Sequence, residues 1–141
     1  MVPAEPLASE PTREGTTSPL APRRRVLVID DSLDYLRSMV LLLRSMGHYA
    51  NFAINATAAI PVARRFRPDV VLLDVGLPDG DGRLLAEQLR KEAGLGEIQI
   101  VCVTGRMHED PRRSIEAGCD AHYVKPLDSP TLRRVLARER G

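Results

Sequence analysis

The sequence predicts an α/β fold in which five parallel strands form one sheet between two layers of helices, a three-layer (βα)5 arrangement. Two observations support this prediction. Five short, mostly apolar runs are spaced along the chain after residue 22, each of a length typical of a buried strand. Stretches with helical periodicity separate these runs, as parallel strands require, and right-handed crossovers leave only a few doubly wound strand orders.

The first strand and helix follow three consecutive arginines, Arg23 to Arg25. The run RVLVID predicts a strand at about 25–30. A helix is expected at about 33–46, because apolar residues recur there at helical spacing and Gly47 supplies a stop. Those apolar residues are Leu36, Met39, Val40, Leu43 and Met46. A weaker apolar run then predicts a second strand at about 49–54.

Prolines punctuate the middle of the chain. A helix at about 57–66 contains Pro61, which must either lie in its first turn or kink it. Pro68 marks the end of that helix, because a proline disfavours helical backbone in the residue before it. The apolar run that follows predicts a third strand at about 69–73.

The last elements alternate in the same way. Asp110 suits the N-cap of a helix, Pro111 suits its first turn, and Gly118 suits the position after its end. The remaining predicted elements are helices at about 82–93, 111–117 and 129–139, and strands at about 98–103 and 120–124.

Length and composition exclude several classes of protein. The 141 residues suffice for one domain, and the net charge of +1 gives no strong field for recruiting nucleic acid or membranes. No apolar run approaches the roughly 18 residues that span a bilayer, and the N-terminus has no secretory signal pattern. We expect a cytoplasmic protein in which Cys102 and Cys119 are reduced thiols.

The first 22 residues differ in composition from the rest. They hold five of the eleven prolines, with Ser, Thr, Glu and Ala between them and no periodic apolar pattern. Such a segment cannot bury enough surface to offset its chain entropy. Residues 1–22 are therefore expected to be a disordered proline-rich arm or linker.

Polar residues stand at the ends of four predicted strands. Asp30 and Asp31 end the first, Asp74 the third, Thr104 the fourth and Lys125 the fifth. In an open α/β sheet, ligands bind outside the carboxyl ends of the strands. If these strands lie side by side, three carboxylates, a hydroxyl and an ammonium converge on one crevice.

The three acids suggest a divalent cation. Carboxylates gathered at a sheet edge repel one another, and a bound cation such as Mg²⁺ relieves that repulsion and prefers oxygen ligands. The simpler alternative is that Asp30 and Asp31 cap the following helix together with Ser32, and that Asp74 is a turn residue.

Lys125 and Thr104 have simple alternatives too. A lysine after a strand can extend into water, and a threonine is a common strand residue. However, Pro126 restricts the backbone of Lys125, which can aim the ammonium into the crevice. Thr104 is followed by Gly105, which allows a ligand to approach the backbone closely.

The motifs VLVIDD, VVLLDVGLPDGDG, VCVTG and VKPL occur in this order over about Arg24 to Arg138. In this the chain resembles a receiver domain of a two-component response regulator. The resemblance implies a receiver domain at 23–141 with a flavodoxin-like fold and strand order 2-1-3-4-5. It also implies a phosphoryl group donated by a sensor histidine kinase or a histidine phosphotransfer protein.

The resemblance assigns a role to each polar residue. Asp74 would be the phospho-acceptor, Thr104 and Lys125 would contact the phosphoryl oxygens, and Thr104 would move toward the new group. The surface at 111–139 would then repack and bind an unknown downstream protein. The implied Mg²⁺ ligands are Asp31, Asp74 and the backbone carbonyl of Gly76, with Asp30 acting mainly through water.

Two positions depart from the common family pattern. Many receivers have an aromatic switch residue three positions before the lysine, where this chain has His122. Strand alternation places Tyr123 on the opposite face, so an imidazole replaces the aromatic ring or lies simply at the surface. Gly76 has no side chain to orient a hydrolytic water near Asp74.

Three alternatives remain at this point. The chain can be a receiver fragment of a hybrid sensor kinase rather than a single-domain regulator. It can be an interaction module that works without phosphorylation, although the intact set of acids, Thr104 and Lys125 argues against this. A phosphohydrolase with an aspartate nucleophile would need a second acid two residues after the first on its first strand, which DDSLD does not supply there. Direct nucleic acid binding is not expected, because no recognisable DNA- or RNA-binding motif is present.

Overall fold

A computed structural model describes residues 23–92, 94–95, 97–105 and 110–137. The proline-rich arm predicted at 1–22 lies outside these residues. The strands are β1 (Arg25–Ile29), β2 (Tyr49–Ala53), β3 (Val70–Asp74), β4 (Gln99–Thr104) and β5 (Ala121–Val124). The helices are α1 (Leu33–Ser45), α2 (Ala56–Phe66), α3 (Gly82–Lys91), α4 (Pro111–Glu116) and α5 (Ser129–Ala137).

The five strands form one parallel sheet in the order β2-β1-β3-β4-β5. Both the fold class and the strand order expected from the sequence are therefore confirmed. Leu27 of β1 aligns with Asn51 of β2 on one side and with Val71 of β3 on the other. β3 thus lies between β1 and β4, so the three strand ends meet at one edge of the sheet.

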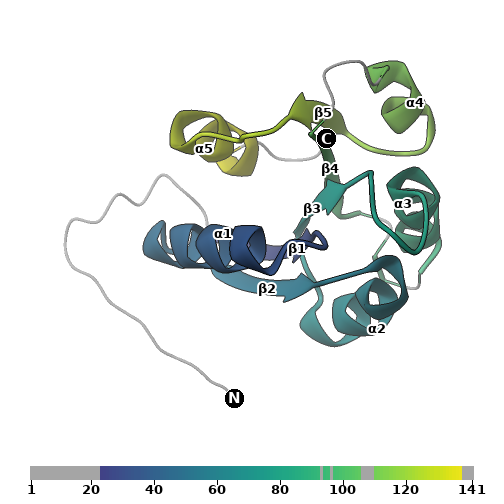
Figure 1. Cartoon of the computed structure of the whole chain (residues 1–141). Coiled ribbons are helices and arrows are strands. Elements are labelled where there is room, and N and C mark those ends of the chain that lie inside the picture. Colours follow the sequence, from purple (N-terminus) through teal and green to yellow (C-terminus); the bar gives the residue numbers. More distant parts are fainter. Residues whose placement is uncertain (1–22, 93, 96, 106–109, 138–141) are drawn as a thin grey trace.

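Helices cover both faces of this sheet. α1 and α5 lie on one face, and α2, α3 and α4 lie on the other (Figure 1). Because successive strand residues point to opposite faces, Val26 and Val28 pack toward α1 and α5, and Leu27 and Ile29 pack toward α2 and α3. This two-sided burial explains why β1, β3 and β4 read as continuous apolar runs rather than as alternating ones.

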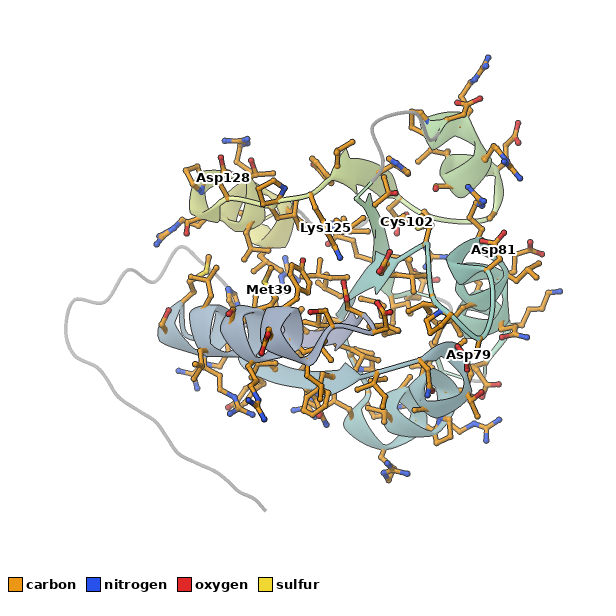
Figure 2. The ribbon with its side chains drawn as sticks, in the orientation of Figure 1. Met39, Asp79, Asp81, Cys102, Lys125 and Asp128 are labelled. Carbon is orange, nitrogen blue, oxygen red and sulfur yellow. A yellow bond between two sulfur atoms is a disulfide. The ribbon has the colours of Figure 1, made fainter. Side chains whose placement is uncertain are left out.

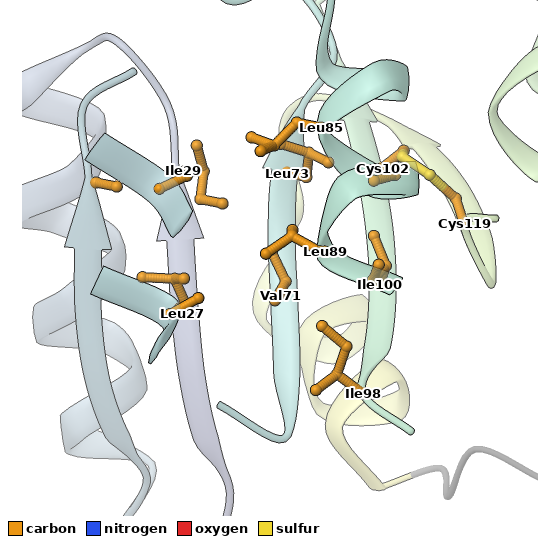
Figure 3. Close-up of a cluster of buried hydrophobic side chains, with 14 of the residues drawn as sticks. Leu27, Ile29, Val71, Leu73, Leu85, Leu89, Ile98, Ile100, Cys102 and Cys119 are labelled. Carbon is orange, nitrogen blue, oxygen red and sulfur yellow. A yellow bond between two sulfur atoms is a disulfide. The ribbon is translucent and has the colours of Figure 1, made fainter. Parts of the chain in front are cut away.

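The core on the α2 and α3 side is built from buried side chains of β1, β2, β3 and β4 and of the two helices. Figure 3 shows Leu85 and Leu89 of α3 over Val71 and Leu73 of β3, with Ile100 of β4 beside them. All five side chains are buried. This packing fixes the position of β3 and β4, and with it the strand ends where Asp74 and Thr104 stand.

The helix ends follow the capping signals in the sequence. Ser32 accepts a hydrogen bond from the Tyr35 amide at the start of α1, and Asp110 accepts one from the Arg112 amide at the start of α4. Gly118, after α4, has φ +107°, a left-handed conformation that favours glycine. Pro61 lies inside α2 beyond its first turn, which excludes the first-turn alternative.

The expectation of two reduced thiols is wrong for this structure, in which Cys102 and Cys119 form a disulfide. Their Cα atoms are 6.2 Å apart, within the usual range for such a bond. Cys102 lies in β4, and Cys119 lies just before β5, the neighbour of β4 (Figure 3). The pairing depends on strand adjacency, so cysteine number and spacing did not reveal it.

Among the described residues, no helix is both long enough and apolar enough to cross a membrane.

Candidate functional site

Three carboxylates gather at the carboxyl edge of the sheet. Asp30 and Asp31 directly follow β1, and Asp74 is the last residue of β3. One oxygen atom from each side chain lies within 4.8 Å of the others. Their burial differs, since Asp30 is 1% exposed, Asp74 is partly buried and Asp31 faces solvent.

Asp30 is the buried anchor of this cluster. Its Oδ2 accepts a hydrogen bond of 2.5 Å from Lys125 Nζ, and its Oδ1 accepts one of 2.9 Å from the Ser32 amide. The Asp30 amide donates to the Ala53 carbonyl at the end of β2. The carboxylate is therefore fixed in place, and one of its two oxygens is already used in starting α1.

The surroundings of Asp74 favour the protonated form of its carboxyl group. Burial raises the pKa of the Asp74 carboxyl above its usual value, and the neighbouring Asp30 and Asp31 add to that rise. The Gly76 amide, which donates to Oδ1 at 2.9 Å, and Lys125, 3.7 Å from Oδ2, act in the opposite direction. The balance leaves a carboxylate that added positive charge would stabilise.

Lys125 directly follows the edge strand β5 and supplies positive charge to the carboxylates. Figure 2 shows it reaching from the segment after β5 toward the middle of the molecule. Its amide donates to the Thr104 carbonyl at 2.7 Å, and the bond between Lys125 and Pro126 is cis. Thr104 is the last residue of β4 and is 3% exposed. The structure therefore brings the acids, Lys125 and Thr104 to the same end of the sheet.

The loop after Asp74 is held in a tight conformation. A side chain at Gly82 would put Cβ 2.5 Å from the Val75 Cα, so only glycine fits there. Asp79 ties the loop to α2 by accepting hydrogen bonds from the Ala56 and Thr57 amides and from the Thr57 hydroxyl. These bonds lower the pKa of the Asp79 carboxyl. Together they restrain the backbone that carries Gly76.

Asp79 and Tyr35 were not singled out by sequence reasoning. Asp79 reads as a turn residue in DVGLPDGDG, and nothing local pairs it with residues 56–57. The Tyr35 ring centre lies 4.4 Å from the Lys125 Nζ, although 90 positions separate the two residues in the sequence. Neither relation has a local signal, because each depends on how separate elements come together.

His122 lies on β5, away from the carboxylates. Its Nδ1 is 2.8 Å from the Ser114 hydroxyl oxygen, which links β5 to α4. Ser114 is fully buried, and His122 is partly buried rather than freely exposed. Tyr123, the next residue, packs against the core on the α1 and α5 side. The imidazole thus occupies the face of β5 that α4 covers.

Comparisons with known proteins agree with this geometry. The family model described as "Response regulator receiver domain" matches residues 26–137. The Pseudomonas aeruginosa protein PilH is 31% identical over 113 residues, covering 79% of this chain and 93% of PilH. The DNA-binding response regulator MtrA of Mycobacterium tuberculosis is 32% identical over 119 residues, covering 84% of this chain and 51% of MtrA.

Solved structures show the same fold. The Vibrio cholerae chemotaxis protein CheY4 superposes with a TM-score of 0.76 at 24% identity, covering 84% of this chain and 99% of that chain. The receiver domain of the Pseudomonas aeruginosa sensor histidine kinase PA1611 gives a TM-score of 0.75 at 25% identity, covering 85% and 99%. That structure has a magnesium ion coordinated in its active-site cleft. The chain therefore belongs to the response regulator receiver domain family of two-component signalling.

Proposed function

We propose that Asp74 accepts a phosphoryl group from a phosphohistidine on a sensor histidine kinase or a histidine phosphotransfer protein, in a reaction that requires Mg²⁺. The observation that carries this proposal is the position of Lys125 Nζ, 2.5 Å from Asp30 and 3.7 Å from Asp74. One ammonium is placed between the buried acid and the proposed acceptor. From this position the ammonium can form an ion pair with a phosphoryl group bound to Asp74.

The donor set fits a magnesium ion. Asp30, Asp31 and Asp74 offer carboxylate oxygens, the ligands that Mg²⁺ prefers, and these oxygens lie close enough together to bind one ion. We assign the ion to Asp31, Asp74 and the Gly76 carbonyl, with Asp30 acting mainly through water. A bound Mg²⁺ would neutralise charge on the phosphoryl oxygens and on the clustered acids.

The reaction is an in-line displacement at phosphorus. An Asp74 carboxylate oxygen forms the new O–P bond as the N–P bond to the donor histidine breaks, and the imidazole leaves with the electron pair. Lys125 stabilises charge on the transferred group, and the buried Thr104 hydroxyl is the donor that moves toward it. The product is an acyl phosphate, which water can hydrolyse. The chain catalyses only its own phosphorylation and dephosphorylation.

We propose that the signal leaves through the face formed by α4, β5 and α5. Ile115 of α4 and Val124 of β5 are 48% and 41% exposed there, and an unidentified downstream protein would bind them. His122, bonded to Ser114, replaces the aromatic switch residue of other receivers. Movement of Thr104 changes the space next to β5, and the bond between His122 and Ser114 passes this change to α4.

The test uses a small acyl phosphate as donor, with and without Mg²⁺, on the wild type and on Asp74→Ala. Mass spectrometry of the intact protein measures one added phosphoryl group. Labelling that requires Mg²⁺ and disappears in Asp74→Ala is the expected result. Asp69→Ala is the matched control, because Asp69 precedes β3 at the end opposite Asp74 and accepts a hydrogen bond from the Arg25 amide, and it should still be labelled. Absence of labelling in the wild type would instead favour an interaction module that needs no phosphorylation.

A further inference from the structure

The Lys125 ammonium belongs to a closed ring of contacts that includes an aromatic side chain. Lys125 Nζ donates to Asp30 Oδ2, Asp30 Oδ1 accepts from the Ser32 amide, and the Ser32 hydroxyl accepts from the Tyr35 amide at 3.2 Å. The Tyr35 ring closes the cycle, with its centre 4.4 Å from Lys125 Nζ. The same short segment, residues 30–35, therefore fixes both the carboxylate and the ring that hold the ammonium.

The Tyr35 ring is suited to this contact. It lies in the first turn of α1 and is partly buried. Burial, with the nearby Asp30 and Asp74 carboxylates, raises the pKa of the Tyr35 phenol to about 12, so the side chain stays neutral. An aromatic face attracts a cation within about 6 Å of its centre, most strongly where water is excluded.

A neutral partner has an advantage that another acid would lack. A lysine side chain is a flexible four-carbon stem, so its ammonium needs more than one contact to stay in place. A third carboxylate beside Lys125 would add negative charge where a phosphoryl group must arrive. The Tyr35 ring attracts the ammonium without adding a formal charge, so it orients Lys125 and leaves the charge available for the incoming group.

We infer that Tyr35 is a positioning residue for Lys125, and that its ring holds the ammonium where it can stabilise phosphoryl transfer to Asp74. This inference rests on the proposed function. It concerns the ring face rather than the hydroxyl, so Tyr35→Phe should behave like the wild type and Tyr35→Leu should not. Tyr35 itself need not touch the phosphoryl group.

The chain offers an unusually clean spectroscopic test, because it contains only two lysines, Lys91 and Lys125. Protein labelled with ¹³C-lysine gives two sets of side-chain signals, assigned with Lys91→Arg. Lys91 is exposed at the end of α3 and serves as the internal reference. The Lys125 Hε protons should show an upfield ring-current shift in the wild type and Tyr35→Phe that is lost in Tyr35→Leu, without any phosphodonor present.

The kinetic test measures the rate of labelling by a small acyl phosphate in saturating Mg²⁺. Tyr35→Leu should be slower than the wild type by about three- to tenfold, the size expected for loss of one partly desolvated cation–aromatic contact, and Tyr35→Phe should restore the rate. Tyr49→Leu is the matched control. Tyr49 is the first residue of β2, and its ring contacts Arg23 and Arg25 rather than Lys125. The Tyr49→Leu variant should be labelled at the wild-type rate.

The outcomes distinguish a failure of the role inferred for Tyr35 from a failure of the proposed function. If the wild type is labelled and Tyr35→Leu is labelled equally fast, the proposed function stands and this inference is wrong. A Tyr35→Phe variant as slow as Tyr35→Leu would assign the effect to the hydroxyl and would also overturn it, as would a wild type with no ring-current shift at Lys125. If no protein is labelled, the proposed function fails, and the kinetic role of Tyr35 fails with it. Circular dichroism confirms that each variant is folded.

Discussion

Lys125 and Asp30 form an ion pair of 2.5 Å across 95 positions of sequence. Asp30 follows β1 and Lys125 follows β5, and these strands are not neighbours, because β3 and β4 lie between them. The lysine side chain spans the carboxyl edge of the sheet to reach a carboxylate that is 1% exposed. This single contact links the edge strand β5 to β1 and spans the carboxyl ends of β3 and β4.

Removing Lys125 should destabilise the protein when Mg²⁺ is absent. Lys125→Met leaves the buried Asp30 without its cation, and breaking a buried pair costs about 3 kcal/mol. The Ser32 amide, which still bonds Asp30, limits this loss. We expect the free energy of unfolding in urea to fall by about 2–3 kcal/mol. Adding Asp30→Asn to Lys125→Met should recover part of it, and an unchanged double variant would contradict the pairing.

Replacing Asp74 should stabilise the protein near neutral pH. The pKa of the Asp74 carboxyl is raised in the folded protein, so the folded protein binds a proton at this group more tightly than the unfolded chain does. Ionised Asp74 therefore lowers stability once the pH exceeds the unfolded value, and this effect is complete above the folded value. Asp74→Asn should be more stable than the wild type at pH 7 without Mg²⁺, by about 1.4 kcal/mol for each unit of raised pKa.

The pH dependence gives the control for that prediction. The difference between Asp74→Asn and the wild type should shrink as the pH falls toward the ordinary carboxyl range and vanish below it. Saturating Mg²⁺ at pH 7 should also shrink the difference, because the ion binds the folded wild type through Asp74. Urea unfolding at several pH values measures both effects, and a difference that grows on acidification would have the wrong sign.

A side chain at position 76 should change the lifetime of the phosphorylated state. A Cβ on Gly76 would lie 3.6 Å from Asp74 Oδ1, an ordinary contact, so Gly76→Asn fits without displacing the Asp74 side chain. The added amide can hydrogen-bond a water beside the phosphoryl group. One such bond should shorten the lifetime by about two- to tenfold. Decay of the labelled mass after donor removal measures it. Gly80→Asn in the same loop, whose Cβ would face Ala56, should decay at the wild-type rate.

The disulfide should contribute to global stability. It closes a loop across a sequence separation of 17, and in the chain-entropy account such a cross-link is worth about 3 kcal/mol. Cys119→Ala should therefore unfold at lower urea concentration than the oxidised wild type, and the wild type unfolded in excess thiol reductant should approach the variant. Cys102 and Cys119 are buried, at 0% and 4% exposure, so the disulfide of the native protein should resist reduction by thiols until the protein unfolds. Equal stability of variant and oxidised wild type would show that the bond contributes nothing.

The secondary-structure elements, and the functional side chains at their ends, could be predicted from the sequence. Apolar runs and periodicity, with capping and breaker residues, located the five strands and five helices that the structure describes, because these signals reflect local backbone geometry. They put Asp30, Asp74, Thr104 and Lys125 at or just after strand ends, and the direction of parallel strands then brings those ends to one edge. Asp110 marked the start of α4 for the same local reason, since its side chain accepts a hydrogen bond from the Arg112 amide.

The contacts between side chains at that edge could not be predicted from the sequence and follow from how the elements pack together. Four contacts join segments that are separated in the sequence. They are the ion pair of Lys125 with Asp30, the Tyr35 ring on the Lys125 ammonium, the hydrogen bonds of Asp79 at the start of α2, and the disulfide between Cys102 and Cys119. Local propensity carries no information about such pairs. Their geometry depends on strand order and on how each helix packs against the sheet, and those are set by the burial of the whole core.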